Sequence, residues 1–398
     1  MSEPRDVSGP RDLLGLVLVP ILALVTAFVI GAFLVVLTDF EHLQRLGSDP
    51  VGALGGALDV VIRGYGAIVT RGIGDPERMV AALQSGSAAD IAKAIRPFTE
   101  ALLFSTPLIF LSLGIGVAFR AGLFNLGADG QFLIGSLGAT IGAVSLDGSL
   151  PPGLILVAAL ILGTLFGAGY GFLPGILKAR TGAHEVITTL MLNTIAAQIV
   201  FFVTRNGAFS KALPSIASVP RIIDLPTIRL DWGFVAALVV AAVLSVVLFR
   251  TTLGYELRAT GFSRSAARAA GIRPGRATVI AMSISGGLAG MGGAFLTLGP
   301  GGLGGFEGGF VALALALLGG LRPSGIVLAA LMYGALNNGA KVMVVETGVP
   351  LMLLVVIIAL AMMFVAAPSL TRSIWRLKTP QRPLEAGSYR PAGSVEPL

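Results

Sequence analysis

Long uncharged runs of hydrophobic residues alternate with short polar stretches along nearly the whole chain. The first run extends from Leu13 to Leu37 without a charged residue. At about 1.5 Å per residue, a helix of this length spans the ~30 Å hydrocarbon core of a bilayer. Because backbone polar groups in lipid must be paired within their own segment, such runs predict membrane helices. We expect ten, the eighth being short: 13–37, 98–118, 131–147, 152–176, 185–203, 231–249, 277–298, 308–321, 324–344 and 350–367.

The composition supports this class of protein. The 398 residues are 55% hydrophobic and 12% charged, whereas soluble domains carry about 25% charged residues. The mean hydropathy is +0.87. The 54 glycines suit close packing of membrane helices, and Gly286 and Gly290 form a GxxxG pair that predicts such packing. We therefore predict an all-α, polytopic membrane protein. The absence of cysteine excludes disulfides and thiolate metal sites.

The positions of arginine and lysine orient the chain, because basic residues concentrate in the short cytoplasmic loops of membrane proteins. The segment 250–276 alone carries six arginines, whereas the basic residues of 204–230 do not fit the orientation. The resulting plan has a cytoplasmic N-terminus at 1–12, a transmembrane domain at 13–367 with an extracytoplasmic segment at 38–97 and a cytoplasmic loop at 250–276, and a disordered cytoplasmic tail at 368–398.

One stretch within 38–97 is ambiguous. Val51–Val69 is mildly apolar, but Asp59 and Arg63 interrupt it. We expect an interfacial or extracytoplasmic helix there, with an eleventh membrane span as the alternative.

Two glycine-rich interruptions suggest an internal repeat. The sequence FNLGADGQ (124–131) follows the second span and GPGGLGGFEGG (299–309) follows the seventh. These two spans run in opposite directions, as in inverted-topology halves whose broken segments line a substrate path. Chance placement of glycine in a glycine-rich chain is the alternative.

Several catalytic signatures are absent from the sequence. None of the lysines follows a glycine, so there is no Walker A motif, and the two histidines form no HExxH. No GxSxG motif occurs. We therefore expect no enzymatic activity and no bound cofactor or metal. Any ATP hydrolysis that drives this protein must come from another chain. The positive charge follows the membrane topology and gives no reason to expect nucleic acid.

The arginine-rich loop contains the pattern of a short helix. Ser263 is a good N-cap, Arg264–Ala270 are mostly helix formers, and Gly271 occupies the position that favours a left-handed residue. Arg264 and Arg268 share one face by their spacing. A helix of two turns is unstable alone in water and needs a surface to dock on. A solvated loop that merely sets topology is the alternative.

Four blocks of sequence carry a family resemblance. AFRAGLFNLGADGQ (118–131), TGAHEVITTLMLN (181–193), TTLGYELRATGFSRSAARAAGI (251–272) and GFVALALALLGGLRPSGIVLAALMYGALNNG (309–339) occur in this order. They resemble the permease subunits of bacterial ABC importers, in the branch for simple sugars and nucleosides that includes relatives of the ribose permease. The resemblance covers about residues 98–367.

The resemblance implies a plasma-membrane protein with three kinds of partner: a cytosolic ABC ATPase, a second permease subunit that is identical or paralogous, and an extracytoplasmic substrate-binding protein. It also implies that the loop between spans six and seven carries a helix that couples to the ATPase. The residues that match this segment, with the two arginines of the short helix added, are Gly254, Tyr255, Glu256, Leu257, Arg258, Gly261, Arg264, Arg268 and Gly271. Asp129 departs from the family's more common glutamate, which puts the transfer of substrate roles in doubt.

Polar residues within the spans are candidates for the translocation pathway, because polar groups in hydrocarbon tend to face a cavity or the bundle interior. Interhelical hydrogen bonding is the alternative role. The polar candidates are Asn125, Asp129, Gln131, Glu185, Asn193 and Asn337, and Phe124 and Phe306 of the two glycine-rich breaks are added to them.

We therefore expect the transmembrane subunit of an ATP-driven importer that moves a nucleoside or simple sugar by alternating access. A secondary transporter driven by an ion gradient, acting without an ATPase, is the alternative.

Overall fold

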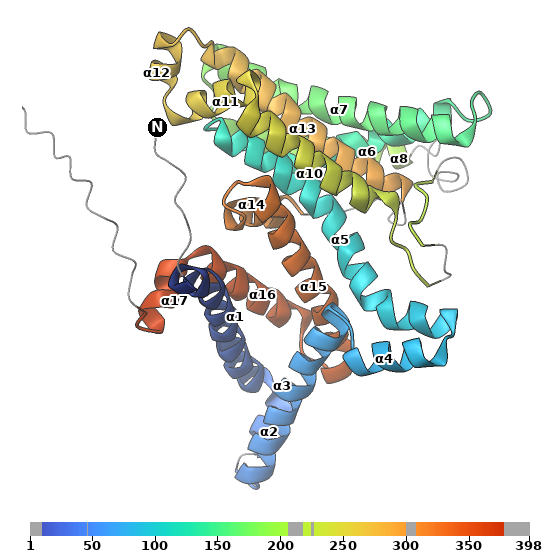
Figure 1. The fold of residues 1–398 in the computed structure, drawn as a ribbon, viewed down its shortest axis with the longest axis vertical. Coiled ribbons are helices and arrows are strands. Elements are labelled where there is room, and N and C mark those ends of the chain that lie inside the picture. Colours follow the sequence, from blue (N-terminus) through green and yellow to red (C-terminus); the bar gives the residue numbers. More distant parts are fainter. Residues whose placement is uncertain (1–9, 46, 206–217, 224–226, 300–307, 378–398) are drawn as a thin grey trace, which may run out of the picture.

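The computed structural model describes residues 10–45, 47–205, 218–223, 227–299 and 308–377, and the described chain is almost entirely helical (Figure 1). The bounds of the first eight helices are α1 Pro10–Thr38, α2 Phe40–Arg45, α3 Pro50–Gly72, α4 Pro76–Ser85, α5 Ala88–Arg120, α6 Ala128–Ser145, α7 Pro152–Thr181 and α8 Glu185–Arg205. Those of the rest are α10 Trp232–Arg250, α11 Thr252–Phe262, α12 Arg264–Ala269, α13 Pro274–Leu298, α14 Gly309–Leu318, α15 Pro323–Thr347, α16 Leu351–Ala366 and α17 Pro368–Ile374.

Each of the ten predicted spans coincides with a helix. Among the described helices, eight are long and apolar enough to cross a membrane: α1, α3, α5, α7, α8, α10, α13 and α15. The helices α14 and α16 are apolar but shorter. Helix α6 was counted in the sequence analysis but is not among these eight; it carries Asp129 and Gln131 near its start. The all-α membrane class is therefore confirmed, while the set of spans differs from the prediction at α3 and α6.

The difference at α3 has a physical reason. The sequence analysis kept Val51–Val69 outside the membrane because of Asp59 and Arg63. In the structure these two side chains form an ion pair one turn apart, so their charges neutralise each other. The helix also packs along α15. By its length and hydropathy, α3 is therefore a candidate for the eleventh span that the sequence analysis gave as the alternative to an interfacial or extracytoplasmic helix.

The segment after α16 begins with a helix, α17. Part of the segment expected to be disordered forms α17, in which the Thr371 hydroxyl donates to the Phe364 carbonyl oxygen at 3.0 Å. The indole of Trp375 donates to the Thr26 hydroxyl of α1 at 2.9 Å. Residues 378–398 lie outside the described part of the chain.

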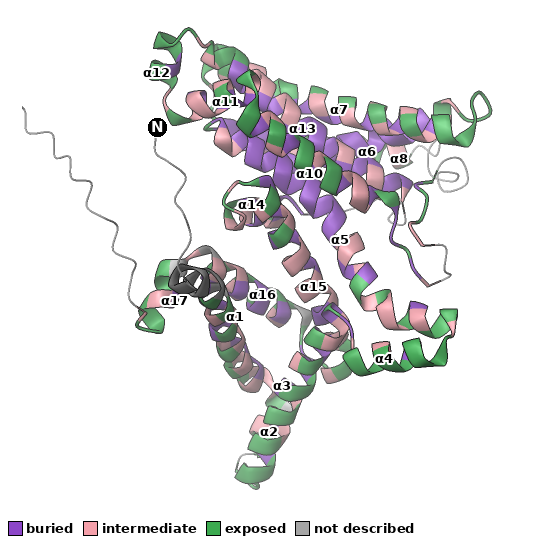
Figure 2. Cartoon of the chain, viewed as in Figure 1, coloured by how far each residue is buried: buried purple, intermediate pink, exposed green. Residues whose placement is uncertain are grey.

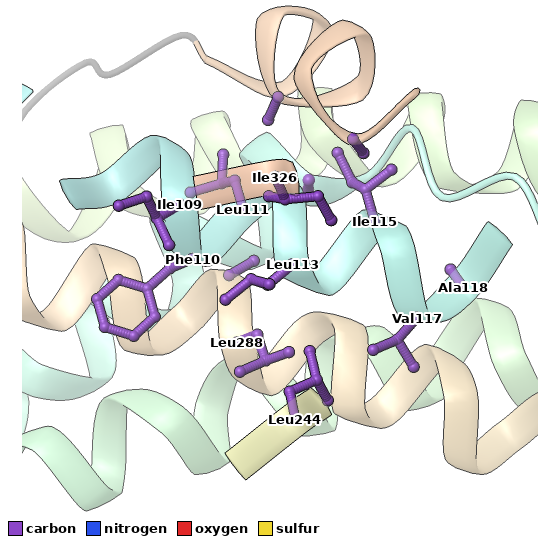
Figure 3. Packing of buried hydrophobic residues seen from close by; sticks show 14 of the residues in the cluster. Ile109, Phe110, Leu111, Leu113, Ile115, Val117, Ala118, Leu244, Leu288 and Ile326 are labelled. Carbon is purple, nitrogen blue, oxygen red and sulfur yellow. The ribbon is translucent and has the colours of Figure 1, made fainter. Parts of the chain in front are cut away.

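The main hydrophobic core surrounds the second half of α5 and α13, whose apolar windows are the most buried among the candidate membrane spans; Figure 2 shows the second half of α5 as largely buried. Ile109, Phe110 and Leu113 of α5 are at most 1% exposed. Figure 3 shows that they lie among side chains from other helices, including Leu288 of α13 and Leu244 of α10. The outer helices expose many large apolar side chains, as expected for a surface that faces lipid rather than water.

Helices α7 and α13 approach each other through glycine. A Cβ atom on Gly286 would lie 2.4 Å from the Gly167 carbonyl oxygen, and one on Gly290 would lie 2.8 Å from the Gly167 Cα. Any larger residue would force the two backbones apart, so the predicted packing role of this GxxxG pair is confirmed.

A second core is formed by α1, α3, α15 and α16. The Tyr65 hydroxyl of α3 donates to the Phe28 carbonyl oxygen of α1 at 2.6 Å. Helix α15 contributes to both cores, and Tyr333 packs against each of them. Helix α15 therefore joins the two parts of the molecule visible in Figure 1, as does α16, whose Met362 also packs against both cores.

The described part of the segment between α8 and α10, residues 218–223 and 227–231, packs against the beginning of α5. Ile228 is fully buried there beside Ala92. Arg229 donates to the Glu100 carboxylate of α5 at 2.9 Å, and this hydrogen bond raises the pKa of Arg229. The loop whose arginines did not fit the charge rule therefore lies at the same end of the bundle as the start of α5, with one arginine paired.

Candidate functional site

The arginine-rich loop folds into two helices at one end of the bundle, α11 and α12 (Figure 1). Helix α11 is anchored by buried residues. Leu257 is 1% exposed and belongs to the main core. A Cβ atom on Gly254 would lie 2.2 Å from the Val247 carbonyl oxygen, and one on Gly261 would lie 2.2 Å from the Arg120 carbonyl oxygen. Three of the predicted coupling residues, Gly254, Leu257 and Gly261, therefore attach α11 to α10 and α5.

Helix α12 has the capping that its sequence predicted. The Ser263 hydroxyl accepts a hydrogen bond from the Ala266 N–H at 3.3 Å. At the other end, Gly271 has a φ of +80°. Its N–H donates to the Arg268 carbonyl oxygen and that of Ile272 to the Ala267 carbonyl oxygen, both at 3.0 Å. This is a Schellman motif, which pairs the carbonyl groups at the helix end.

The two helices present an exposed face with aromatic and basic groups. Within α12, Ala267 is the buried residue, and Arg264 and Arg268 are exposed. Phe262, in the junction between the helices, is 96% exposed, and Tyr255 is 59% exposed. The list of candidate residues from the sequence did not include Phe262. The signal for it was an aromatic residue between Gly261 and Ser263, directly before the predicted N-cap of the short helix.

Two arginines fix the base of this segment. The Arg120 guanidinium lies 4.7 Å from the centre of the Phe249 ring, and the Arg258 guanidinium lies 5.4 Å from it. Arg120 also donates to the Leu321 carbonyl oxygen at 2.7 Å, in the turn between α14 and α15. The predicted coupling residue Arg258 is thus a partly buried packing element, and Glu256 is half-exposed beside it.

The break after α5 forms a buried network of amides. The Asn125 side-chain nitrogen donates to the Gln131 side-chain oxygen and to the Ser285 hydroxyl, both at 2.8 Å. Asn125 and Gln131 are at most 1% exposed. Asn193 of α8 accepts from the Gly130 N–H and donates to the Leu126 carbonyl oxygen, both at 2.8 Å. These side chains hold the break against α8 and α13, which is the interhelical role that the sequence analysis set beside a pathway role.

Asp129 connects this break to the second one. Its carboxylate accepts from the backbone N–H groups of Gly308 and Gly309 at 3.1 and 2.7 Å. These residues form the N-terminus of α14. A carboxylate there pairs donors that have no intrahelical partner and interacts favourably with the helix dipole.

The remaining pathway candidates lie apart from this network. Glu185 at the start of α8 pairs with Lys178 at 2.7 Å. Phe124 is 50% exposed and contacts Phe119, with ring centres 4.6 Å apart. Phe306 lies outside the described residues.

Two adjacent asparagines of α15, Asn337 and Asn338, differ in their side-chain hydrogen bonding. The Asn338 side-chain nitrogen donates to the Arg71 carbonyl oxygen of α3 at 2.9 Å and the Pro97 carbonyl oxygen of α5 at 3.0 Å. The Asn337 side-chain oxygen is buried and has no hydrogen-bond partner in the described part of the structure. Such an unpaired group costs roughly 1–3 kcal/mol. Asn338 therefore joins helices, whereas Asn337 keeps an unused acceptor inside the protein.

The described residues contain no group of three or more potential metal-binding side chains. The described residues form a helical bundle that exposes α11 and α12 at one end. Inside it, Asp129 connects the break before α6 with the start of α14.

Residues 98–367 match the family described as the branched-chain amino acid transport system permease component. The chain belongs to this permease family. The match begins within α5 and ends just after α16, as the resemblance noted in the sequence suggested.

The permease is also similar to curated relatives. It is 37% identical to the guanosine ABC transporter permease protein NupP of Bacillus subtilis strain 168, over 49% of this chain and 58% of that protein. It is 31% identical to the nucleoside ABC transporter permease protein NupB of Lactococcus lactis, over 71% of each chain. It is 30% identical to the glucose ABC transporter permease protein TsgB13 of Haloferax volcanii, over 49% of this chain and 55% of that protein. No solved structure matches the permease.

Proposed function

We propose that this permease is the membrane subunit of an ATP-driven importer that moves nucleosides by alternating access, with both termini in the cytoplasm. Its partners would be a cytosolic ATPase, a second permease and an extracytoplasmic binding protein. The proposal depends mainly on the structure of the segment α11–α12. It is anchored by buried residues on one side and exposes Phe262 and the arginines of α12 on the other. The chain has no Walker A motif, so the ATPase belongs to another polypeptide.

A continuous set of contacts supports a route from this segment to the interior. Gly261 of α11 rests on the Arg120 backbone. Arg120 in turn holds the Leu321 carbonyl oxygen at the end of α14. The other end of α14 is capped by Asp129 of α6. Movement of α11 by a bound ATPase would therefore be transmitted through α14 to the place where the two broken segments meet.

Nucleosides are the favoured substrate class. Among the relatives above, NupP has the highest identity and its name refers to guanosine. NupB has the longest matched region and its name refers to nucleosides. Glucose, in the name of TsgB13, represents the alternative class of simple sugars.

The test is reconstitution of the permease in proteoliposomes with its genomic neighbours: the ATPase, the second permease and the binding protein. We expect nucleoside uptake that requires ATP and the ATPase. Uptake by the permease alone, driven by a Na⁺ or H⁺ gradient, would instead establish a secondary transporter. ATP-dependent uptake of glucose but not of nucleosides would keep the importer and overturn the substrate class.

A further inference from the structure

Helix α17 lies on the same side of the bundle as α11. Arg120 contacts Gly261 of α11 through its carbonyl oxygen, and its guanidinium donates to the Leu321 carbonyl oxygen in the turn before α15. Helix α15 therefore starts near α11 and leads away from it. The short connection 348–350 then reverses the chain, so that α16 runs back and α17 begins on the side from which α15 started. In Figure 1, α17 lies next to α1 and the end of α16, both of which it contacts.

The surface of α17 combines exposed apolar side chains with basic ones. Leu370 and Ile374, one turn apart, are 48% and 54% exposed, and Trp375 beside them is 44% exposed. Arg372 is partly exposed and Arg376 is exposed. Neither arginine forms an ion pair with a residue in the described part of the chain. An apolar face next to basic groups without partners is typical of a helix that lies in the interface of a membrane.

The hydrogen bond of Trp375 fits this interfacial position. Its indole N–H donates to the Thr26 hydroxyl of α1 at 2.9 Å. The candidate membrane span of α1 begins at Ile21, so the bond is formed about 7.5 Å along the helix from that end of the span. Interfacial helices bury their apolar side by about 5–10 Å, and tryptophan is enriched at this level of membrane proteins. We therefore place α17 at the membrane surface.

The backbone at Arg376 supplies an independent observation. Helix α17 ends in a Schellman motif, in which the Leu377 N–H donates to the Arg372 carbonyl oxygen at 2.9 Å and the Arg376 N–H to the Ser373 carbonyl oxygen at 3.3 Å. This motif holds Arg376 in the left-handed region, with a φ of +49°. Glycine usually occupies such a position because it has no Cβ atom, as it does after α7 and α15. An arginine kept in this strained conformation indicates a use for its guanidinium.

We propose that α17 binds the anionic phospholipids of the cytoplasmic leaflet, with Arg372 and Arg376 at the phosphate groups and its apolar side chains among the acyl chains. The stretch 368–384 contains four basic residues and no acidic one, and basic clusters directly after a membrane helix are attracted to anionic lipid. Guanidinium groups bind phosphate through paired N–H donors. The choice of leaflet rests on the orientation given under the proposed function, whereas the preference for anionic lipid does not.

The two tryptophans of the chain, Trp232 and Trp375, allow a direct test. The full-length variant Trp232→Phe keeps Trp375 as its only indole. It is reconstituted in phosphatidylcholine vesicles that contain phosphatidylglycerol as a minor component. Bromine atoms, which quench indole fluorescence on contact, are placed on the acyl chains either of the phosphatidylglycerol or of an equal amount of the phosphatidylcholine. We expect brominated phosphatidylglycerol to quench Trp375 at least twice as strongly, and this ratio to fall in high salt because salt screens the attraction.

Arg376→Gly in the same background separates the lipid contact from the fold. Glycine adopts the left-handed conformation without strain, so the unfolding temperature in neutral detergent should equal or exceed that of the parent. The quenching ratio should nevertheless fall, and Arg372→Gln together with Arg376→Gly should bring it close to one. A lower unfolding temperature for Arg376→Gly would show that this arginine stabilises the fold, and the proposal would be wrong.

Trp375→Phe is the matched control, since it keeps Trp232, which is 51% exposed at the start of α10. Both brominated lipids should quench Trp232 equally. If they also quench Trp375 equally, α17 has no preference for anionic lipid and the proposal is overturned. If neither quenches Trp375, protein rather than lipid covers this helix, and the proposal is again wrong. These measurements need neither substrate nor ATPase, so a failure of nucleoside uptake would count against the proposed function alone.

Discussion

The carboxylate of Asp129 accepts a hydrogen bond from the backbone N–H of Gly309 at 2.7 Å, across 180 residues of chain. Asp129 belongs to the first turn of α6, and Gly309 is the first residue of α14. A Cβ atom on Gly309 would lie 2.4 Å from this carboxylate, so the contact requires glycine. The two glycine-rich breaks are therefore joined directly. The inverted repeat that they suggested stays a prediction.

Removal of this cap should destabilise the permease. In Asp129→Ala, the N–H groups of Gly308 and Gly309 lose their acceptor, so we expect a loss of about 1–2 kcal/mol and a lower unfolding temperature. Asp129→Asn should retain most of the stability, because asparagine is also a good capping residue. Thermal unfolding in detergent measures both. Equal unfolding temperatures for Asp129→Ala and the wild type would show that the cap contributes nothing.

The contact between α7 and α13 predicts that alanine substitutions at two glycines of α7 change the stability of the permease in different ways. A Cβ atom on Gly167 would lie 2.4 Å from the Gly286 carbonyl oxygen, whereas one on Gly169 would meet nothing within 4 Å. We expect Gly167→Ala to lower the unfolding temperature strongly. Gly169→Ala should be neutral or stabilising by up to about 1 kcal/mol, since alanine favours helix. A tolerated Gly167→Ala would mean that the two helices have room to separate.

The exposed aromatic at the α11–α12 junction should contact the ATPase. We expect Phe262→Ala to weaken co-purification of the ATPase and to lower ATP-dependent uptake, because burial of a phenylalanine contributes about 1.5–3 kcal/mol. Phe202→Ala is the matched control, since Phe202 is 68% exposed but lies on α8. Its association with the ATPase should match that of the wild type.

Membrane insertion of Phe262→Ala should be normal, because this side chain is 96% exposed in the permease. Glu256→Ala and Arg258→Ala should also impair coupling. The effect of Arg258→Ala is expected to include a loss of packing on Phe249. If Phe262→Ala, Glu256→Ala and Arg258→Ala all transport like the wild type, the coupling role of α11–α12 is wrong.

Much of the fold follows from the sequence, because long uncharged runs leave a helix as the only paired backbone in lipid. The short helix after Ser263 was also predictable, since its capping residues act locally. A helix was also predicted at Val51–Val69, but as an interfacial or extracytoplasmic one, because Asp59 and Arg63 were counted as two separate charges; their pairing is made within the folded helix α3.

The roles of the site residues were harder to predict. Asn125 and Asn337 look alike in the sequence, since both are amides in apolar surroundings. The structure pairs Asn125 with Gln131 and Ser285 but leaves the Asn337 oxygen unpaired among the described residues. One partner of Asn125, Ser285, lies 160 residues further along the chain, so the sequence around Asn125 does not reveal this pairing. Similarly, the sequence around Asp129 does not indicate that its carboxylate accepts a hydrogen bond from the Gly309 N–H.

The last prediction concerns Asp231, which precedes α10 and accepts from the Gly233 N–H at 2.8 Å. Its side chain is buried, and burial raises its pKa from 3.8 to about 6. Between about pH 4 and pH 6 the folded state therefore binds more protons than the unfolded state, so stability falls as the pH rises through this window.

Asp231→Asn keeps a capping oxygen and removes the titration. It should exceed the wild type in stability by at most about 3 kcal/mol at pH 8, and the gain should shrink toward pH 4. Unfolding temperatures in detergent across this range test the difference. Asp49→Asn is the control. Asp49 is an exposed cap of α3 that accepts from the Gly52 N–H at 3.0 Å, so this variant measures the effect on stability of exchanging a capping carboxylate for an amide without burial. A gain at Asp231 that is the same at pH 4 and pH 8 would exclude the buried charge as its cause.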